Sequence, residues 1–228
     1  MVWKKDFIFL MLNFGDTTCK NKISGISNPV SNIQYPESKK MDKNKVISRY
    51  QLTLDVIDHL HLKNKPVVLH KGESFVGYGE KTKRIGILLH GLLYATYISD
   101  NGAEWVSRFF FPPNNFIVSN HEGFYFGTNS TESIKAYEDS ELIYIEKEEF
   151  KNLLDSNRNF ERTVRILAEE SYIQSISRIH SFQSLNAEQR IRKFFTENPE
   201  LGKKLQRQHI ASYLGIHRNI LTRFLYKI

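Results

Sequence analysis

The chain has 228 residues, but it contains only one cysteine and no long apolar run. The single Cys19 excludes an internal disulfide, a zinc ribbon and a cysteine-held iron–sulfur cluster within one chain. No apolar stretch approaches the roughly 20 residues that cross a bilayer, so we expect neither an integral membrane protein nor a membrane partner. Hydrophobic residues make up 40% of the chain, enough for one large domain or two modest ones. A reducing cytoplasm is the simplest compartment for such a chain.

The histidines also lack the spacing of a metal or catalytic site. His59 and His61 lie two positions apart on a predicted helix, where they point in different directions. A cupin-type site needs two nearby histidines on a strand, followed by a Glu and a further His, whereas His70, His90 and His121 are isolated. We therefore expect no catalytic residue, no metal site and no bound cofactor.

Positive charge is concentrated toward the C-terminal end of the chain. Residues 161–228 contain 12 Lys and Arg against 6 Asp and Glu, whereas residues 41–160 contain 14 against 16. Residues 1–40 contain 6 against 3, and the formal net charge of the whole chain is +7. A local basic surface is favoured by the release of counterions from a phosphate backbone. This distribution indicates that the C-terminal segment binds nucleic acid.

The first 65 residues divide near Met41. Residues 1–40 begin with a charged and then a short apolar stretch, and they continue as a polar, turn-rich segment of the kind that is typical of disorder. We interpret them as a disordered or wrongly assigned N-terminal extension, which need not belong to the native protein. From Met41 to about Lys65 apolar residues recur at helical spacing, so a helix is expected there.

The segment from Leu205 to Ile228 carries the pattern of two short helices joined by a tight turn. Apolar residues recur at helical spacing on both sides of Gly215, which can adopt the positive φ that the turn requires. Ala211 is small where the two helices approach each other, and Ile216 turns back into the shared core. The pattern predicts a helix-turn-helix, although an ordinary helical hairpin with a solvated polar face has the same spacing.

The second helix of this pair, roughly His217 to Tyr226, has an outward face that suits DNA. Arginine matches the two major-groove acceptors of guanine, asparagine pairs with adenine, and Thr or His can reach base edges or phosphate. Residues at the start of the first helix are placed to hold the DNA backbone, which positions the protein without recognising sequence. The candidate DNA-contacting residues are Arg207, Gln208, His217, Arg218, Asn219, Thr222 and Arg223.

Residues 66–145 form short apolar runs rich in Val, Ile, Phe and Tyr, separated by turn signals. About eight such runs without a helix between them predict an antiparallel roll or barrel. Asn101-Gly102, between two of the runs, indicates a hairpin whose two central residues both need positive φ. The expected strands are 67–69, 74–76, 85–89, 92–98, 105–111, 116–118, 133–137 and 142–145.

A long helix is expected between Glu148 and Phe182, because apolar residues recur there at helical spacing. These residues cover more than one side of the helix, so the helix needs more than one packing partner. An interruption from Ser181 to Asn186 is the expected hinge. A further helix is predicted from Ala187 to Asn198, where Asn198-Pro199-Glu200 ends it.

This order of elements resembles the Crp/Fnr family of transcription regulators over about Met41 to Ile228. The matching local sequences are Leu-Leu-His-Gly-Leu-Leu-Tyr, Asp-Asn-Gly and Phe-Phe-Pro-Pro-Asn-Asn-Phe in the roll, and residues 208–218 in the helix-turn-helix. The resemblance implies that the recognition helix enters the major groove and that a dimer binds a two-fold symmetric site. It places Arg218, Asn219 and Arg223 at the family's base-contacting positions.

The resemblance also supplies the two partners that the long helix needs, namely the chain's own roll and the equivalent helix of a second subunit. A helix buried wholly within a monomer is the alternative. The residues expected at the dimer contact are Val164, Leu167, Tyr172, Ile176 and Ile179.

The effector half departs from the family pattern. Members that bind cyclic AMP carry a Gly-Glu pair for the ribose and an Arg-Ser/Thr-Ala run for the phosphate. This chain has Val118-Ser119 and Ser130-Thr131-Glu132 at those positions. The arginine is missing and Glu132 adds negative charge beside the phosphate position, so cyclic AMP is not the expected effector. The candidate effector pocket, for an unknown small molecule if there is one, comprises Val118, Ser119, Ser130 and Thr131.

The predicted architecture is α+β, with an antiparallel β-roll (double-stranded β-helix, jelly-roll-like), a long dimerisation helix and a C-terminal winged-helix-like helix-turn-helix domain. The roll is expected over residues 41–150, the dimerisation helix and hinge over 151–184, and the DNA-binding domain over 185–228. The expected partners are double-stranded DNA, a second copy of the chain and RNA polymerase. The alternative hypothesis is a small-molecule-binding sensor or cupin-like protein with no DNA-binding role.

Overall fold

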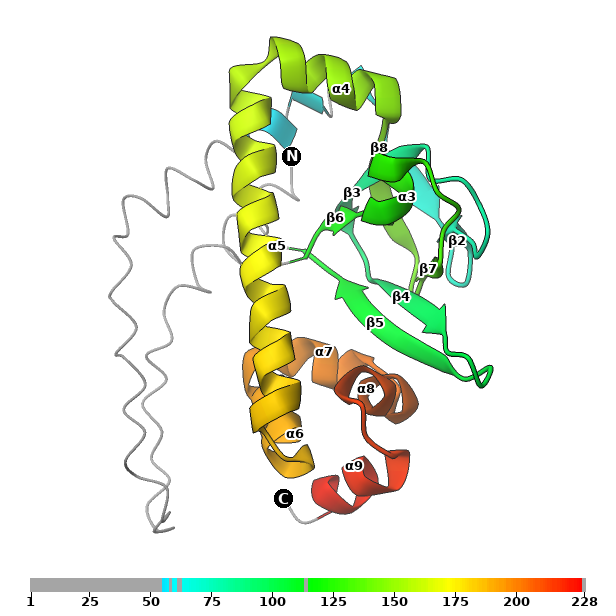
Figure 1. Ribbon diagram of the computed structural model, residues 1–228, viewed down its shortest axis with the longest axis vertical. Coiled ribbons are helices and arrows are strands. Elements are labelled where there is room, and N and C mark those ends of the chain that lie inside the picture. Colours follow the sequence, from blue (N-terminus) through cyan, green and yellow to red (C-terminus); the bar gives the residue numbers. More distant parts are fainter. Residues whose placement is uncertain (1–54, 58, 61–62, 113–114, 227–228) are drawn as a thin grey trace, which may run out of the picture.

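The computed structural model describes residues 55–57, 59–60, 63–112 and 115–226 (Figure 1). The predicted N-terminal extension and most of the helix predicted from residue 41 to 65 lie outside this part of the chain. The last turns of that helix are described, and Val56, Ile57 and Leu60 are buried in the core of the roll. This segment therefore packs against the domain that follows it.

The strands within the described residues form two four-stranded antiparallel sheets. The first sheet contains, in spatial order, β1 (Val67–Leu69), β8 (Ser140–Glu146), β3 (Arg84–His90) and β6 (Ile117–Val118). The second sheet contains β2 (Ser74–Val76), β7 (Glu132–Ala136), β4 (Leu93–Ile98) and β5 (Glu104–Phe110). Each predicted strand is present within two residues of its expected ends, and the antiparallel roll is confirmed.

The two sheets enclose the first hydrophobic core of the molecule. Ile134 of β7 and Ile143 of β8 are fully buried, one from each sheet, and Phe110 of β5 is 1% exposed. Full burial of a side chain of this size is worth about 1.5–3 kcal/mol. The roll is therefore held together by side chains that meet between the sheets.

The hairpin between β4 and β5 differs from the prediction, because Asn101 does not have positive φ. Gly102 alone has it, at 80°. Gly102 N donates to Ser99 O at 2.8 Å and Ser99 N donates to Ala103 O at 2.9 Å. This is the pattern of a longer loop, in which a type I turn is followed by a left-handed glycine. Asn101 contributes through its side chain, whose Oδ1 accepts from Ala103 N at 3.1 Å.

A short helix, α3 (His121–Phe126), interrupts the strands, so the expectation of a roll without a helix is wrong. Asn120 caps this helix, because its side-chain oxygen accepts from Gly123 N at 2.7 Å. Phe124 anchors the helix in the core, with its ring edge-on to Phe150 at a centroid distance of 5.4 Å. Six residues are too few to show a helical period in the sequence.

Six helices follow the roll in the described part of the chain: α4 (Lys147–Ser156), α5 (Arg158–Ser184), α6 (Ala187–Glu197), α7 (Pro199–Lys204), α8 (Arg207–Leu214) and α9 (Arg218–Leu225). Helix α5 runs along the length of the molecule, with the roll beside its first half and α6 to α9 around its far end (Figure 1). None of the described helices has the length and apolar content that a membrane crossing requires.

The break between α5 and α6 is limited to residues 185–186, which is shorter than the predicted interruption. Helix α6 begins with a capping box, in which the side chains of Asn186 and Gln189 each accept from the other's backbone N–H. Pro199 ends α6 as predicted, but it also begins α7, which the sequence pattern did not separate. The described residues after Glu146 contain no strand, so they include no wing.

The C-terminal helices build a second core against the outer surface of the roll. Each of these helices contributes apolar residues that are at most 6% exposed, and the roll contributes three residues of its own. The members from the helices include Ile191, Phe194, Leu201, Ile210, Leu221 and Phe224, and those from the roll are Leu92, Val106 and Phe109.

A β-bulge in β5 makes this second core possible. Val106 and Phe109 are three residues apart, so in a regular strand their side chains would lie on opposite faces. The pairing with β4 shifts by one residue between Arg108 and Val106, so that both side chains reach the second core. Phe110, the next residue, points into the roll instead.

Gly91, in the turn between β3 and β4, allows a direct test of how tightly the roll is closed. Its φ is 103°, and a Cβ there would lie 2.7 Å from the Ser140 Cα of β8. Gly102 has a similar φ of 80° but open space around it. We expect Gly102→Ala to cost about 1–2 kcal/mol of unfolding free energy from the backbone conformation alone. Gly91→Ala should cost at least about 3 kcal/mol, because the backbone of β8 must also move.

The measurement is denaturant unfolding followed by circular dichroism, with Gly102→Ala as the matched control. Equal losses for the two variants would contradict the close contact between Gly91 and β8.

Candidate nucleic-acid interface

Helices α8 and α9 form the helix-turn-helix that the sequence predicted. Gly215 ends α8 in the left-handed conformation, with φ 61° and ψ 41°. Ile216 N donates to Ala211 O at 3.0 Å and Gly215 N donates to Ser212 O at 3.1 Å, which together make a Schellman motif. The turn is therefore fixed by backbone hydrogen bonds, and Ile216 is buried directly after it, as expected.

Helix α9 buries one face and leaves the other free. Leu221 is fully buried and Phe224 is 5% exposed, which holds α9 on the second core. Arg218, Asn219 and Arg223 are exposed on the outer face. Within the described residues, neither arginine forms an ion pair with a carboxylate. The outer face of α9 is thus a cationic surface that no carboxylate of the described residues neutralises.

The remaining candidate DNA contacts are placed differently from one another. His217 is the N-cap of α9, and its Nδ1 accepts from Asn219 N at 3.2 Å, so this side chain holds the helix start. Thr222 is partly buried. Arg207 and Gln208 are exposed at the start of α8, and the Arg207 guanidinium lies 5.7 Å from the centre of the Tyr226 ring. The cap role of His217 could have been recognised from its place just before the helix.

The five residues expected at a dimer contact fall on two faces of α5. Val164 and Leu167 are partly buried against the core of the chain's own roll. Tyr172 and Ile179 are 67% and 49% exposed, and Ile176 lies between them in sequence and is partly exposed. Ile173 is also 65% exposed. The spacing of 172, 176 and 179 is that of a coiled-coil seam.

The predicted effector pocket in the roll is largely closed. Val118 and Ser119 are fully buried and Ser130 is 4% exposed, whereas Thr131 is exposed. Thr131 alone among these four residues lines a surface hollow of about 410 Å³ beside α3. The structure thus brings these residues into one region without making a pocket from all of them.

An ion pair that the sequence did not indicate occupies this region. The Glu132 carboxylate accepts from the Arg108 guanidinium, and its other oxygen accepts from Ser107 Oγ at 3.0 Å. Asn120 Nδ2 also donates to Glu132, at 3.4 Å. Arg108 lies 24 residues before its partner, on a different strand, so no local pattern could predict the pair. The negative charge predicted at Glu132 is therefore neutralised within the chain.

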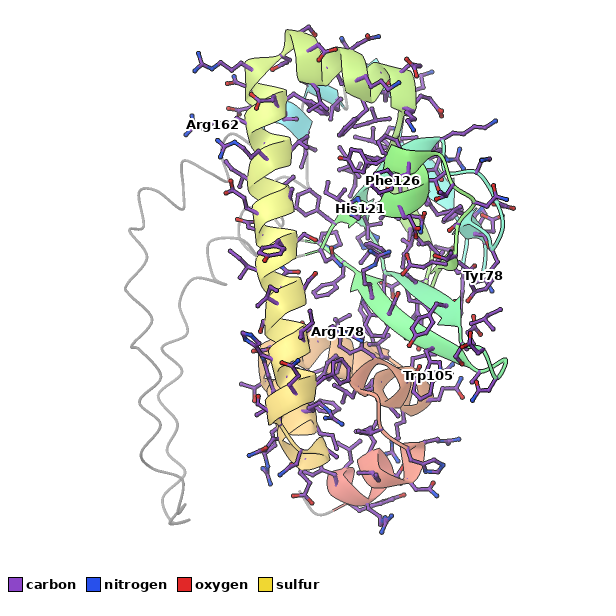
Figure 2. All side chains as sticks on the ribbon, in the orientation of Figure 1. Tyr78, Trp105, His121, Phe126, Arg162 and Arg178 are labelled. Carbon is purple, nitrogen blue, oxygen red and sulfur yellow. The ribbon has the colours of Figure 1, made fainter. Side chains whose placement is uncertain are left out.

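The helix-turn-helix is docked on the roll through α8. Ser212 Oγ accepts from Val106 N of β5 at 2.8 Å, and the rings of Tyr213 and Phe109 lie 5.1 Å apart. Figure 2 shows Trp105, the neighbour of Val106, where β5 meets these helices. The contact continues at the start of α8, where the backbone N–H of its N-cap residue Gln206 donates to the Tyr137 hydroxyl at 2.8 Å. This docking sets the position of α9 relative to the roll.

His209 is the titratable group at the centre of this contact. Its ring lies 5.4 Å from the rings of both Tyr94 and Tyr137, and its Nδ1 is buried without a hydrogen-bond partner in the described part of the chain. Burial lowers the pKa of His209, and the nearby Glu104 carboxylate opposes this to a smaller extent. The docked state therefore favours the neutral imidazole.

We expect acid to weaken this docking. Because the folded pKa of His209 is lowered, the stabilisation is complete above the unfolded value of about 6.5 and is lost as the pH falls toward the folded value. The midpoint of thermal unfolding should fall between about pH 7.5 and pH 5.5 by more in the wild-type chain than in His209→Phe, which keeps a ring but cannot bind a proton. Equal falls in the two proteins would contradict the assignment.

A metal site of this kind needs three or more His, Cys, Asp or Glu side chains close together. The described residues contain no such group. His70 instead pairs with Asp139, at 3.7 Å between Nδ1 and a carboxylate oxygen. The histidines considered for a cupin-type site therefore do not combine into one within this part of the chain.

No protein-family profile matches the chain. No curated protein sequence matches it either. Solved structures do share its fold and span most of the chain. FixK2 from Bradyrhizobium japonicum superposes with a TM-score of 0.61 at 14% identity, covering 72% of this chain and 83% of that one. A putative transcriptional regulator of the Crp/Fnr family from Eubacterium rectale gives 0.57 at 18% identity, covering 79% and 82%.

The c-di-GMP-responsive global regulator CLP from Xanthomonas campestris gives a TM-score of 0.59 at 14% identity, covering 82% of this chain and 91% of that one. At such low identities the likeness is one of fold. The chain has a Crp/Fnr-like fold, as its sequence led us to predict.

Proposed function

We propose that this chain is a sequence-specific DNA-binding transcription regulator that binds two-fold symmetric sites as a homodimer. The observation that carries the proposal is the outer face of α9, where Arg218, Asn219 and Arg223 are exposed on a helix whose other face is buried. Arginine and asparagine are the side chains that best match guanine and adenine in the major groove. The positive charges of Arg218 and Arg223 have no carboxylate partner among the described residues, so phosphate and base acceptors can satisfy them.

The remainder of the helix-turn-helix supports the same role. Arg207 and Gln208 lie exposed at the start of α8, where they can hold the DNA backbone. His217 contributes by capping α9, and it remains available to phosphate through its exposed edge. The recognition surface is thus divided between base-contacting residues on α9 and backbone-contacting residues on α8.

Helix α5 supports the homodimer. Tyr172, Ile176 and Ile179 follow coiled-coil spacing on the face turned away from the roll, and the two ends of this stripe are well exposed in one chain. Pairing two copies of α5 would bury these side chains and would relate two recognition helices by a two-fold axis. The symmetry of such a dimer calls for two inverted half-sites, which in helix-turn-helix dimers lie about one helical turn apart.

The fold neighbours support regulation as the biological role. One is described as a putative Crp/Fnr transcriptional regulator, and CLP is described as a global regulator that responds to c-di-GMP. We extend the proposal to RNA polymerase as a partner, to the cytoplasm as the compartment and to an effector other than cyclic AMP. No catalytic role is assigned to any residue.

Alanine at Arg218 and Arg223 should reduce DNA binding without affecting folding. A binding site is first selected from random duplex DNA with the full-length chain at near-physiological salt, and a two-fold symmetric consensus is expected. Each substitution should then weaken binding to that site by about 1–3 kcal/mol and relax the base preference at one position. The measurement is a fluorescence titration of labelled duplex, with thermal unfolding as the check on folding.

Arg158→Ala is the matched control, because Arg158 is an exposed arginine at the opposite end of α5 from the helix-turn-helix. Arg207→Ala should lower the salt dependence by about one unit of log K against log salt, without changing the consensus. Unaltered binding in the Arg218 and Arg223 variants would reject α9 as the recognition helix.

An aspartate on the exposed face of α5 should separate the dimer. Ile179→Asp and Tyr172→Asp each place a charge in the proposed seam, where its burial is strongly unfavourable. Light scattering should show a mass near 26.7 kDa for the variants and about twice that for the wild-type chain.

Val68→Asp is the control, because Val68 is 54% exposed on β1, away from α5. It should leave the mass unchanged. A wild-type chain that is monomeric at micromolar concentration, or variants that remain dimeric, would refute the proposed seam.

A further inference from the structure

A cavity of about 460 Å³ lies where α5, β5 and the C-terminal helices meet. Its walls come from residues 107–111 of the roll, residues 171–182 of α5, residues 190–198 around α6, and Tyr213 of α8. Figure 2 shows Arg178 on the side of α5 that faces β5, whereas Arg162 points to the other side. The volume is in the range of sites that hold small molecules, roughly 300–1,000 Å³.

Two arginines in the wall of this cavity have no carboxylate partner. No carboxylate oxygen of a described residue lies within 4.0 Å of the guanidinium of Arg178 or Arg190. Arg190 Nε is buried, and its N–H donates to no partner within the described residues. Lys193 adds a third positive charge, which is only loosely paired with Glu197 at 3.9 Å. The cavity therefore carries an excess of positive charge.

Arg178 is held rigidly in place. Its Nη2 donates to Tyr213 O at 3.0 Å, and its guanidinium lies 3.9 Å from the centre of the Tyr213 ring and 5.1 Å from that of Phe182. Arg190 is held by a hydrogen bond of its own, in which Nη1 donates to Leu185 O at 3.0 Å. A planar guanidinium that is already fixed loses little entropy when it binds a carboxylate or phosphate.

The rest of the wall is aromatic or carries hydroxyl groups. Phe109, Phe111 and Phe194 supply aromatic surface, and Ser175 and Ser181 of α5 supply hydroxyls. An inorganic anion alone would leave this aromatic surface uncovered. The lining is suited to a molecule with an apolar or aromatic body and one anionic group.

We propose that this cavity binds a small organic anion, with a carboxylate or phosphate held by Arg178 and Arg190 and an apolar body against the phenylalanines of β5 and α6. Its regulatory meaning rests on the proposed function, since the same ligand would contact α5, the roll and the helix-turn-helix domain. Binding would favour the arrangement in which these three parts enclose the ligand, and it would thereby fix the position of α9. The binding itself is independent of DNA.

The test uses phenyl phosphate as the probe and benzyl alcohol as its neutral counterpart, each titrated into the full-length chain by ligand-observed NMR without DNA. Phenyl phosphate should bind at least about tenfold more tightly than benzyl alcohol, because the charge contributes charge-assisted hydrogen bonds. The double variant Arg178→Gln/Arg190→Gln should lose at least about tenfold in affinity for phenyl phosphate. Arg158→Gln, outside the cavity, should bind as the wild-type chain does.

Ser181→Phe fills the cavity without altering either arginine, and it should also abolish binding. If the double arginine variant fails to fold, Ser181→Phe decides the question. Arg218→Ala/Arg223→Ala must still bind phenyl phosphate, which separates the cavity from the DNA surface. Undiminished binding in the cavity variants, loss in the Arg218/Arg223 variant, equal affinity for benzyl alcohol, or no binding of phenyl phosphate would overturn the proposal.

Discussion

The β-bulge in β5 is the constraint on which the arrangement of this molecule depends. By adding one residue opposite β4, it turns both Val106 and Phe109 toward α8 while Phe110 stays inside the roll. Helices of eight residues, such as α8 and α9, are too short to be stable by themselves, since isolated helices below about 12–15 residues are marginal in water. Their stability must come from packing, and part of the surface they pack on belongs to the roll. The helix-turn-helix is thus an extension of the roll's outer face.

The position of α9 follows from this docking through a short chain of contacts. Ser212 ties α8 to the backbone of β5, and the Schellman turn at Gly215 fixes α9 relative to α8. Arg178 of α5 donates to Tyr213 O, which connects α5 to α8. The docking surface combines a few hydrogen bonds with ring contacts, and a small mixed surface of this kind can exist in two arrangements. A shift at any of these contacts would move α9 relative to the roll and, in the proposed dimer, would change the distance between the two copies of α9.

Much of this fold could be predicted because its elements have strong local signals. The strands alternate with turn residues, and Gly215 between two apolar periods marked the helix-turn-helix. The features that were missed depend on contacts distant in sequence. Helix α3 is held by the burial of Phe124 against Phe150, a residue 26 positions later, and six residues are too few for a helical period to show it. The dimer contact predicted on α5 likewise grouped Val164, which packs on the chain's own roll, with Tyr172, which is exposed. Periodicity identifies the apolar positions of a helix but does not show which partner each of them packs against.

The Arg108–Glu132 pair explains why the arginine in the roll is less available to an anionic ligand than the arginines in the cavity beside α5. In the roll, the Glu132 carboxylate already pairs with the Arg108 guanidinium. Because Glu132 belongs to the same chain, it competes with a free anion at a high effective concentration. Any anion entering there must displace this carboxylate and leave it partly buried without its partner, which is costly. In the cavity beside α5, Arg178 is oriented by a backbone carbonyl and by rings, and neither neutralises its charge. An anion arriving there displaces no carboxylate of the described residues. The internal pair in the roll therefore disfavours an anionic ligand there and favours the proposed site beside α5, at the boundary that positions α9.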